Sequence, residues 1–247
     1  MQYFGELITK YEEVFLTSSY LYFNNEDEKI TPKEFKEKIK NTKVKKKNII
    51  GTIVLYNPVV TPVGYDSNKF LLEQDFDSFD QLIELKTENY ITTFKHALKE
   101  QCAGKVVEII NLFNLVEKKI DASTLLMKFN EDLEKYNSMQ NTEFDRDIMY
   151  LDAANIIPSG KFVFFSWGDK INSTEFPYIH EYAKTLFDNV NNLGKKVSYV
   201  YREEKGIEHS EKYLQFSFPD HNPKYKSAIE NAIRQSFKEF PPSKSFY

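Results

Sequence analysis

The segment from residue 49 to residue 62 constrains the fold more than any other part of the chain. It reads Ile-Ile-Gly-Thr-Ile-Val-Leu-Tyr-Asn-Pro-Val-Val-Thr-Pro, and its apolar, β-branched beginning is typical of a strand buried on both faces. We expect the strand to end at Asn57 and Pro58, because proline donates no ladder hydrogen bond and asparagine favours turns. Ligands of parallel α/β sheets bind where the strands end. Asn57 therefore belongs either to a rigid binding site beside Tyr56 or only to a strand-ending turn.

The overall composition limits the class of protein. Of the 247 residues, 41% are hydrophobic and 15% are aromatic, which is ample for a sizeable core. The net charge of −4 argues against a protein that coats nucleic acid without specificity, but it permits an enzyme with a local basic groove. One cysteine excludes internal disulfides, and no apolar run approaches the roughly 20 residues that span a bilayer. Because the amino terminus lacks a signal-peptide pattern, we expect a cytoplasmic protein with no membrane partner.

Two helices are expected before the first strand. Residues 1–22 place apolar side chains at helical spacing, which predicts an amphipathic helix. A second helix should begin after Thr31, with Pro32 at its first position and Glu34 completing a capping box. These helices would form a flank over residues 1–47.

The second of these helices leads into a strongly basic stretch. Eight lysines lie between residues 33 and 47. Such a run is either a solvated face or a contact with phosphates on an otherwise acidic protein. The lysines nearest the first strand are Lys45, Lys46 and Lys47.

Short apolar segments alternate with helical segments through the rest of the chain. The expected strands after the first are 105–113, 161–168 and 197–201. The expected helices are 78–103, 122–137, 142–154, 175–192 and 223–240. Alternation of this kind predicts an α/β fold in which a four-stranded parallel sheet forms a three-layer α/β/α sandwich. We expect a single domain over residues 1–247, with the core at 48–240.

The carboxyl ends of parallel strands lie on one side of such a sheet, so the residues after each strand should meet around one crevice. The candidate residues there are polar or aromatic in all four cases: Asn57, Asn111 to Asn114, Trp167, and the loop from His209 to His221. A shared crevice explains all four together, whereas a turn-only explanation requires four coincidences.

Other chemical signatures are missing from the sequence. There is no Gly-rich phosphate loop, no Gly-x-Ser-x-Gly elbow and no His-Glu-x-x-His pair. Cys102 is expected in the core, and His96 and His180 fall within helices. The histidines lack metal-ligand spacing, so we expect no metal and no cofactor. His209 and His221 are candidates for function because they lie in the loop that faces the crevice.

The strand ends resemble those of the uracil-DNA glycosylase superfamily. Residues 55–59, Leu-Tyr-Asn-Pro-Val, are similar to the Gly-Ile-Asn-Pro-Gly motif of its mismatch-specific branch. An asparagine ending the second strand is matched by Asn111 or Asn114. Residues 165–168, Phe-Ser-Trp-Gly, are similar to the Leu-Leu-Trp-Gly end of the third strand, and residues 221–223, His-Asn-Pro, resemble the last motif. An uncharacterised bacterial family shares the Asn-Pro turn, the Asn-Leu-Phe strand and the Trp-Gly strand, and the chain resembles it at least as well.

The chain also departs from the superfamily pattern. The carboxylate of the uracil-specific first motif is absent, and Lys224 stands where the last motif has serine. The loop from residue 202 to residue 221 carries four glutamates, which would repel phosphates unless they face away from DNA.

The resemblance implies hydrolysis of the N-glycosidic bond of a base flipped out of DNA, either uracil-type, mismatched or modified, including modified bases of viral DNA. Asn57 would hold the attacking water, and His221 would donate to the oxygen of the departing base. The base would be bound by Tyr56, Tyr65, Phe70, Asn111, Phe113, Asn114 and Trp167. Phosphates would be held by Lys45, Lys46, Lys47, Lys224 and Lys226, the last two at a helix start that favours anions.

Two other classes of function fit the same residues. One is a non-catalytic protein that binds a nucleotide or a protein partner in the crevice, which the acidic loop and the missing carboxylate favour. The other is an enzyme acting on free nucleosides, which needs no basic surface. Binding to DNA should weaken steeply as salt is raised, whereas binding of a nucleoside should not.

Overall fold

The structure is a computed structural model of the 247-residue chain. It describes residues 1–10, 13–24, 29–40, 48–56, 58, 60–65, 81–87, 89–98, 102–116, 126–131, 133–134, 153–168, 176–200 and 223–238.

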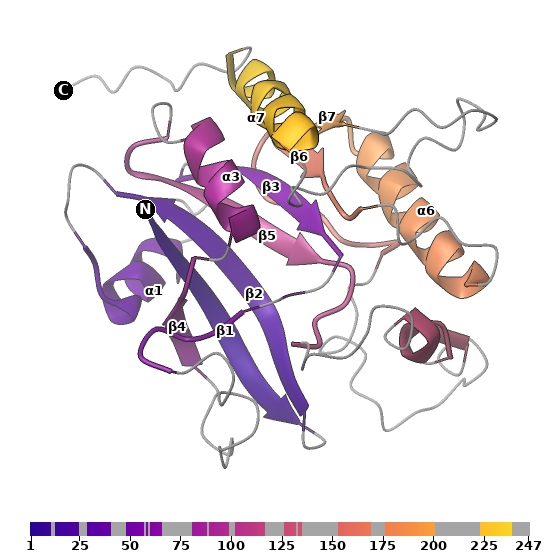
Figure 1. The fold of residues 1–247 in the computed structure, drawn as a ribbon, viewed down its shortest axis with the longest axis horizontal. Helices are drawn as coiled ribbons and strands as arrows, with labels where there is room; N and C mark the ends of the chain where they lie inside the picture. Colours follow the sequence, from indigo (N-terminus) through magenta and orange to yellow (C-terminus); the bar gives the residue numbers. More distant parts are fainter. Residues whose placement is uncertain are drawn as a thin grey trace.

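One seven-stranded mixed sheet runs through the molecule, in the order β4-β1-β2-β5-β3-β6-β7 (Figure 1). The strands are β1 Gln2–Lys10, β2 Glu13–Phe23, β3 Ile49–Leu55, β4 Gln81–Leu85, β5 Lys105–Asn111, β6 Phe162–Phe165 and β7 Lys196–Tyr199. The four strands β5, β3, β6 and β7 are parallel, whereas β2, β1 and β4 extend the sheet with antiparallel pairs. The prediction of an α/β fold is confirmed, but the sheet is larger than the four strands expected.

The amino-terminal segment forms a hairpin of β1 and β2, so the prediction of a helix over residues 1–22 is wrong. Both faces of this hairpin are buried. Val14 packs into the cluster beneath α3 (Asn89–Leu98), while its neighbour Phe15 packs into the cluster beneath α6 (Pro177–Asn192). Because apolar side chains point to both faces, the alternation that identifies a half-buried strand is hidden in this sequence.

The segment expected to form one helix over residues 78–103 instead contains β4 followed by the shorter helix α3. Leu82 and Leu85 have the spacing of a helical face, but they point to opposite sides of the sheet. Leu82 packs beneath α1 (Pro32–Lys40), and Leu85 packs with the residues beneath α3. Antiparallel pairing of β4 with β1 overrides the local helical pattern.

The remaining helices agree with the sequence where the structure describes them. Helix α6 begins with Pro177 at its first turn and ends before Gly194, and α7 runs over Pro223–Lys238. Residues 126–131 and 133–134 are helical within the expected helix 122–137. Of the expected helix 142–154, only residues 153 and 154 are described, and they form a turn.

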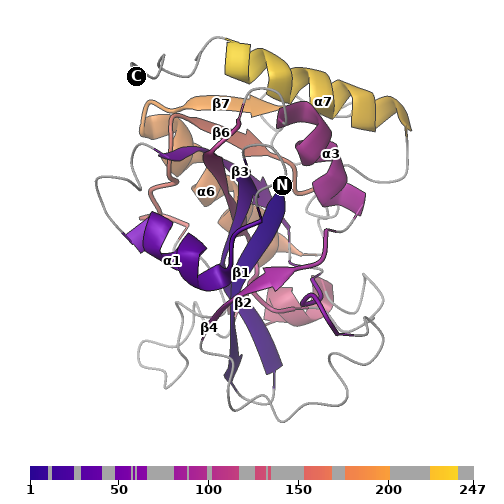
Figure 2. The ribbon, with the colours of Figure 1, turned by 90° about the vertical axis from the view of Figure 1, so that its left-hand side faces the viewer.

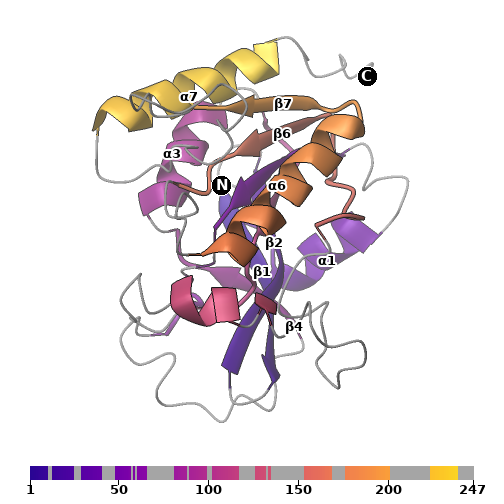
Figure 3. The ribbon, with the colours of Figure 1, turned by 90° about the vertical axis from the view of Figure 1, so that its right-hand side faces the viewer.

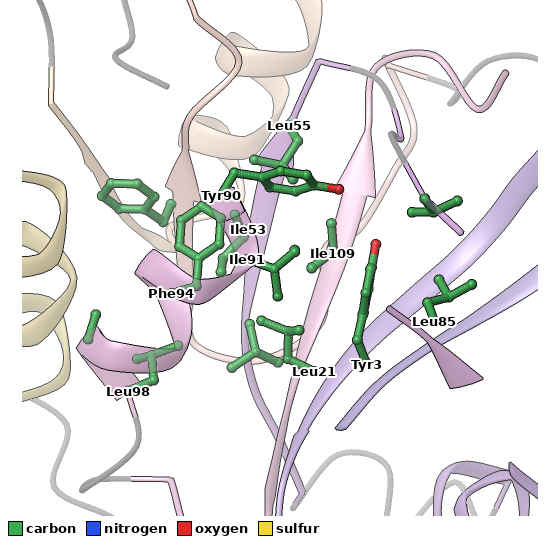
Figure 4. Packing of buried hydrophobic residues seen from close by; sticks show 14 of the residues in the cluster. Tyr3, Leu21, Ile53, Leu55, Leu85, Tyr90, Ile91, Phe94, Leu98 and Ile109 are labelled. Carbon is green, nitrogen blue, oxygen red and sulfur yellow. The ribbon is translucent and has the colours of Figure 1, made fainter. Parts of the chain in front are cut away.

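Helices cover both faces of the sheet. Helices α3 and α7 lie together on one face, and Figure 2 shows them over the same end of the sheet. Helix α6 covers the opposite face of the parallel strands (Figure 3). Figure 4 shows the core beneath α3, where Ile91 and Phe94 meet Leu21, Ile53 and Ile109 from three strands.

Helix α1 begins with the capping box that its sequence predicts. The Thr31 hydroxyl accepts from the Glu34 backbone N–H at 3.3 Å, and the Thr31 backbone N–H donates to the Glu34 carboxylate at 2.7 Å. Phe35 anchors the helix on the antiparallel part of the sheet by stacking on Phe4 with ring centroids 4.4 Å apart. Helix α1 therefore flanks the sheet on the same face as α6.

The start of β6 requires close approach of two backbones. Gly160 has φ +76°, and a Cβ atom there would lie 2.4 Å from the Gly51 nitrogen. Gly51 in turn leaves room for the Phe162 ring. These two glycines allow the turn before β6 to cross β3 and set the parallel register of the pair.

Candidate functional site

The carboxyl ends of β3, β5 and β6 lie side by side. Asn111 pairs with Leu55, and beyond the ladder the Phe113 N–H donates to the Tyr56 carbonyl at 3.0 Å. On the other side of β3, the Ser166 N–H donates to the Val54 carbonyl at 2.8 Å. The segments that carry Tyr56, Asn111 and Trp167 are thus adjacent at one edge of the parallel sheet.

The aromatic residues expected to contact a base are core residues in this structure. Tyr56, Phe113 and Trp167 are at most 4% exposed. Phe113 stacks on Phe129 with centroids 3.8 Å apart, and Trp167 packs edge-on against Phe165 at 4.9 Å. These rings pack in the core next to the strand ends. Their role in base binding stays a prediction.

The other predicted residues are dispersed. Tyr65 is half-buried against the core beneath α3, and its carbonyl accepts a hydrogen bond from the Lys86 ammonium. Lys226 is half-buried on α7, and Lys224 belongs to the first turn of the same helix. The predicted residues outside the described part of the chain are Lys45, Lys46, Lys47, Asn57, Phe70, His209 and His221.

A cavity of about 170 Å³ lies beside the carboxyl end of β5, where the ladder between β2 and β5 is interrupted. The two strands pair as far as Ser19 and Ile109. Pairing resumes only where the Leu16 N–H donates to the Asn114 carbonyl at 2.8 Å. Residues 17 and 18 of β2 therefore face the four residues 110–113, and the two strands diverge around the cavity. Its lining comprises Leu16, Thr17, Ser18, Ser19, Glu108, Ile109, Ile110, Asn111, Asn114, Ile156 and Ile157.

Two of the predicted base-binding residues, Asn111 and Asn114, line this cavity, and each is 3% exposed. The side-chain oxygen Oδ1 of Asn111 has no hydrogen-bond partner among the described residues. Leaving a buried acceptor unsatisfied costs about 1–3 kcal/mol, so such atoms in folded proteins usually meet water or a ligand. Asn111 pairs with Leu55, which packs beneath α3, so its amide lies on the face of the sheet opposite to the side chain of Glu108.

Glu108 supplies a carboxylate to the same cavity, and sequence reasoning missed it. Its Oε2 accepts from the Thr52 hydroxyl at 2.9 Å and from the Ser159 N–H at 2.8 Å, and its Oε1 accepts from the Ser159 hydroxyl at 3.0 Å. A carboxylate offers about four acceptor positions. The donors found among the described residues therefore leave at least one position of Glu108 open. The signal in the sequence was a charged residue in the middle of an otherwise apolar strand.

The surroundings of Glu108 are electrostatically coupled to it. Burial raises the pKa of Tyr20, which pairs with Glu108 across the sheet, to about 12, and the Glu108 charge acts in the same direction. Burial lowers the pKa of Lys195, and the Glu108 charge opposes this shift. Lys195 donates to the Gly160 carbonyl at 2.7 Å. A second carboxylate, Glu6, accepts from the Ser18 hydroxyl at 3.2 Å.

Within the described ranges, no group of three or more His, Cys, Asp or Glu side chains is arranged to hold a metal ion. Among the helices that the structure describes, none has the length and apolar character needed to cross a membrane. Comparisons with protein-family models, with curated proteins and with solved structures found no match.

Proposed function

We propose that this protein hydrolyses the N-glycosidic bond of a nucleobase bound in the cavity beside β5. The observation that carries the proposal is the cavity itself, which lies at the carboxyl end of the parallel strand β5 with Glu108, Asn111 and Asn114 among its lining residues. A cavity of about 170 Å³ is smaller than the roughly 300–1,000 Å³ of drug-sized ligand sites, which suits one base rather than a whole nucleotide. The parallel strands β5, β3, β6 and β7, with helices on both faces, support a uracil-DNA-glycosylase-like fold.

In the proposed reaction, a water molecule attacks C1′ of the sugar as the bond to the base nitrogen breaks. The hydroxyl of the water is added to C1′, and the base leaves with the bonding electron pair and a proton. Asn57, two residues beyond the Leu55 partner of Asn111, would hold the water, and His221 would supply the proton. Because the transition state is a cationic sugar, a negative charge at Glu108 stabilises the developing charge when the sugar lies at the mouth of the cavity.

Helix α1 supports a DNA substrate. Lys33 and Lys38 are exposed on this helix, which flanks the same face of the sheet as the lining residue Glu108. The Nζ atom of Lys36 lies 3.9 Å from the Oε1 atom of Glu6. The exposed ammonium groups would attract the phosphate backbone in a salt-dependent way.

A free nucleoside is the second candidate substrate. The observation that favours it is the pair of carboxylates, Glu108 in the cavity wall and Glu6 on β1, which is bonded to the lining residue Ser18. Their negative charge disfavours phosphates close to the cavity.

The test is to incubate the protein with oligonucleotides carrying uracil, mismatched or modified bases, and separately with free nucleosides. Alkaline strand cleavage detects abasic sites, and chromatography detects released base. Asn111→Leu should reduce base release by more than tenfold, because it removes the hydrogen-bonding amide at similar volume. Asn191→Leu, at an exposed position of α6, is the matched control. If no substrate releases a base, the proposed hydrolysis is wrong; if Asn111→Leu keeps full activity, the reaction takes place elsewhere.

A further inference from the structure

We infer that the main chain of Asn111 binds the base-pairing edge of the nucleobase in the cavity, so that a base methylated on this edge is rejected. The inference rests on the proposed function and specifies its substrate class. It follows from the direction of the peptide groups where β2 and β5 diverge.

The main-chain groups of Asn111 point toward β2. Its carbonyl shares a peptide group with the Leu112 N–H, which donates to the Leu55 carbonyl on β3 at 2.9 Å. The N–H and C=O of a trans peptide point in opposite directions, so the Asn111 carbonyl points away from β3. The Asn111 N–H also points away from β3, because the parallel ladder turns the Ile110 carbonyl of the same peptide toward that strand.

The facing strand supplies no partner for these two groups. The ladder between β2 and β5 ends at Ser19 and Ile109, two residues before Asn111 along β5. The hydroxyl groups of residues 17–19 donate to Glu6 or to the Ile109 carbonyl instead. Among the residues that the structure describes, no hydrogen bond therefore reaches the main-chain N–H or carbonyl of Asn111.

A buried peptide group in this position needs a partner from outside the chain. Asn111 is 3% exposed and lines the cavity, and buried main-chain groups in folded proteins are almost always paired with protein, water or a ligand. In a sheet, the N–H and C=O of one residue pair together with an acceptor and a donor that lie side by side on the partner.

The base-pairing edge of a nucleobase has this arrangement. In thymine, for example, the ring N3–H lies beside the O4 carbonyl, and enzymes that flip a base read this edge by hydrogen bonds. The apolar lining residues Ile156 and Ile157 suit the flat faces of a base. A methyl group on the ring nitrogen removes the donor and would leave the Asn111 carbonyl unsatisfied.

Two pairs of neutral isomers isolate the edge: thymidine against 3-methyl-2′-deoxyuridine, and N2-methyl-2′-deoxyguanosine against 1-methyl-2′-deoxyguanosine. The members of each pair differ only in the position of one methyl group, which occupies the ring nitrogen of the edge in the second member. Binding of each to the full-length protein is measured by calorimetry. In each pair that binds, we expect the isomer with the free ring N–H to bind at least about tenfold more tightly.

The other outcomes separate the inference from the proposed function. A smaller difference or the opposite order in either pair means that water satisfies the main chain of Asn111, which overturns the inference and leaves a base-binding cavity in place. If none of the four nucleosides binds, the proposed function fails together with the inference.

A change confined to the main chain identifies the group responsible. An ester oxygen in place of the Asn111 N–H, introduced with the α-hydroxy analogue of asparagine, keeps every side chain and should weaken binding of the preferred isomer by about tenfold. The matched control is the same ester at Val116, whose N–H donates to Val14 outside the cavity lining, and it should keep the wild-type affinity. A folded Asn111 ester with wild-type affinity overturns the inference. Should this ester not fold, as judged by circular dichroism, the two isomer pairs decide.

Discussion

Glu108 and Ser159, which lie 51 residues apart in the chain, are joined by two hydrogen bonds: the Ser159 N–H donates to Oε2 at 2.8 Å, and the Ser159 hydroxyl donates to Oε1 at 3.0 Å. The carboxylate in the middle of β5 thereby holds the turn that leads into β6. One residue thus shapes the cavity wall and also positions a neighbouring loop.

Removal of this carboxylate should destabilise the protein. Glu108→Ala leaves the Ser159 N–H and hydroxyl without their acceptor, at a cost of about 2 kcal/mol in the free energy of unfolding. Glu108→Gln should cost less, because it keeps one acceptor oxygen. Glu6→Ala is the control, since the contacts of Glu6 with Ser18 and Lys36 are partly exposed and weak. Urea denaturation measures all three, and wild-type stability of Glu108→Ala would contradict the anchoring role.

Gly160 and Gly194, which both have positive φ, should respond differently to alanine. At Gly160 the new Cβ would collide with the backbone of Ile50 and Gly51, and we expect a loss of about 3 kcal/mol or more. At Gly194, where φ is +66° and nothing lies within 4 Å, only the left-handed backbone is penalised, by about 1–2 kcal/mol. Thermal unfolding of both variants gives the comparison. Equal losses would show that the backbones at Gly160 can separate without cost.

Tyr20 should make the protein sensitive to alkali. Burial raises its pKa from 10.0 to about 12, with the charges of Glu108 and Glu6 adding to the shift. The folded state holds the phenolic proton more tightly than the unfolded state does. The contribution of Tyr20 to the free energy of unfolding is therefore complete below pH 10 and is lost as the pH rises from about 10 to about 12. Between pH 9 and pH 11 the free energy of unfolding of the wild type should fall by about 1 kcal/mol more than that of Tyr20→Phe, which lacks the titrating group. Parallel stability curves for the two proteins would contradict this.

The thiol of Cys102 should be inert in the native protein. Cys102 is fully buried between α3 and β5, and burial raises its pKa to about 12, so almost no thiolate exists at neutral pH. The reaction of native protein with iodoacetamide at pH 8 should be limited by opening of this region, and reaction in denaturant should be fast. Mass spectrometry follows the alkylation. Rapid alkylation without denaturant would mean that the turn before β5 opens readily.

The parallel half of the sheet was predictable from the sequence, whereas the antiparallel half was not. Strands β3 and β6 are nearly continuous apolar runs because they are buried on both faces, and β5 is interrupted in its middle only by Glu108, so these runs are visible locally. Strands β1 and β2 pair with each other as a hairpin, but β1 also pairs with β4 and β2 with β5, which lie far away in the chain. Their apolar residues point to both faces, so the local spacing imitated a helix.

The candidate site was predictable in the same uneven way. Asn111 follows an apolar strand and was identified for that reason. The aromatic residues Tyr56, Phe113 and Trp167 were identified from the same strand ends, but their burial follows from packing against Phe129 and Phe165, which sequence position does not reveal. Glu108 escaped notice because its partners Thr52 and Ser159 come from separate segments.

The pairing of β2 with β5 also has a consequence for biosynthesis. Ser19 donates its hydroxyl to the carbonyl of Ile109, a residue made 90 positions later. At roughly 5–20 residues per second, the edge of β2 is exposed on the ribosome for about 5 to 20 seconds before its partner is synthesised. Unpaired strand edges are templates for association with other chains. The amino-terminal hairpin therefore benefits from chaperone protection until β5 has been synthesised.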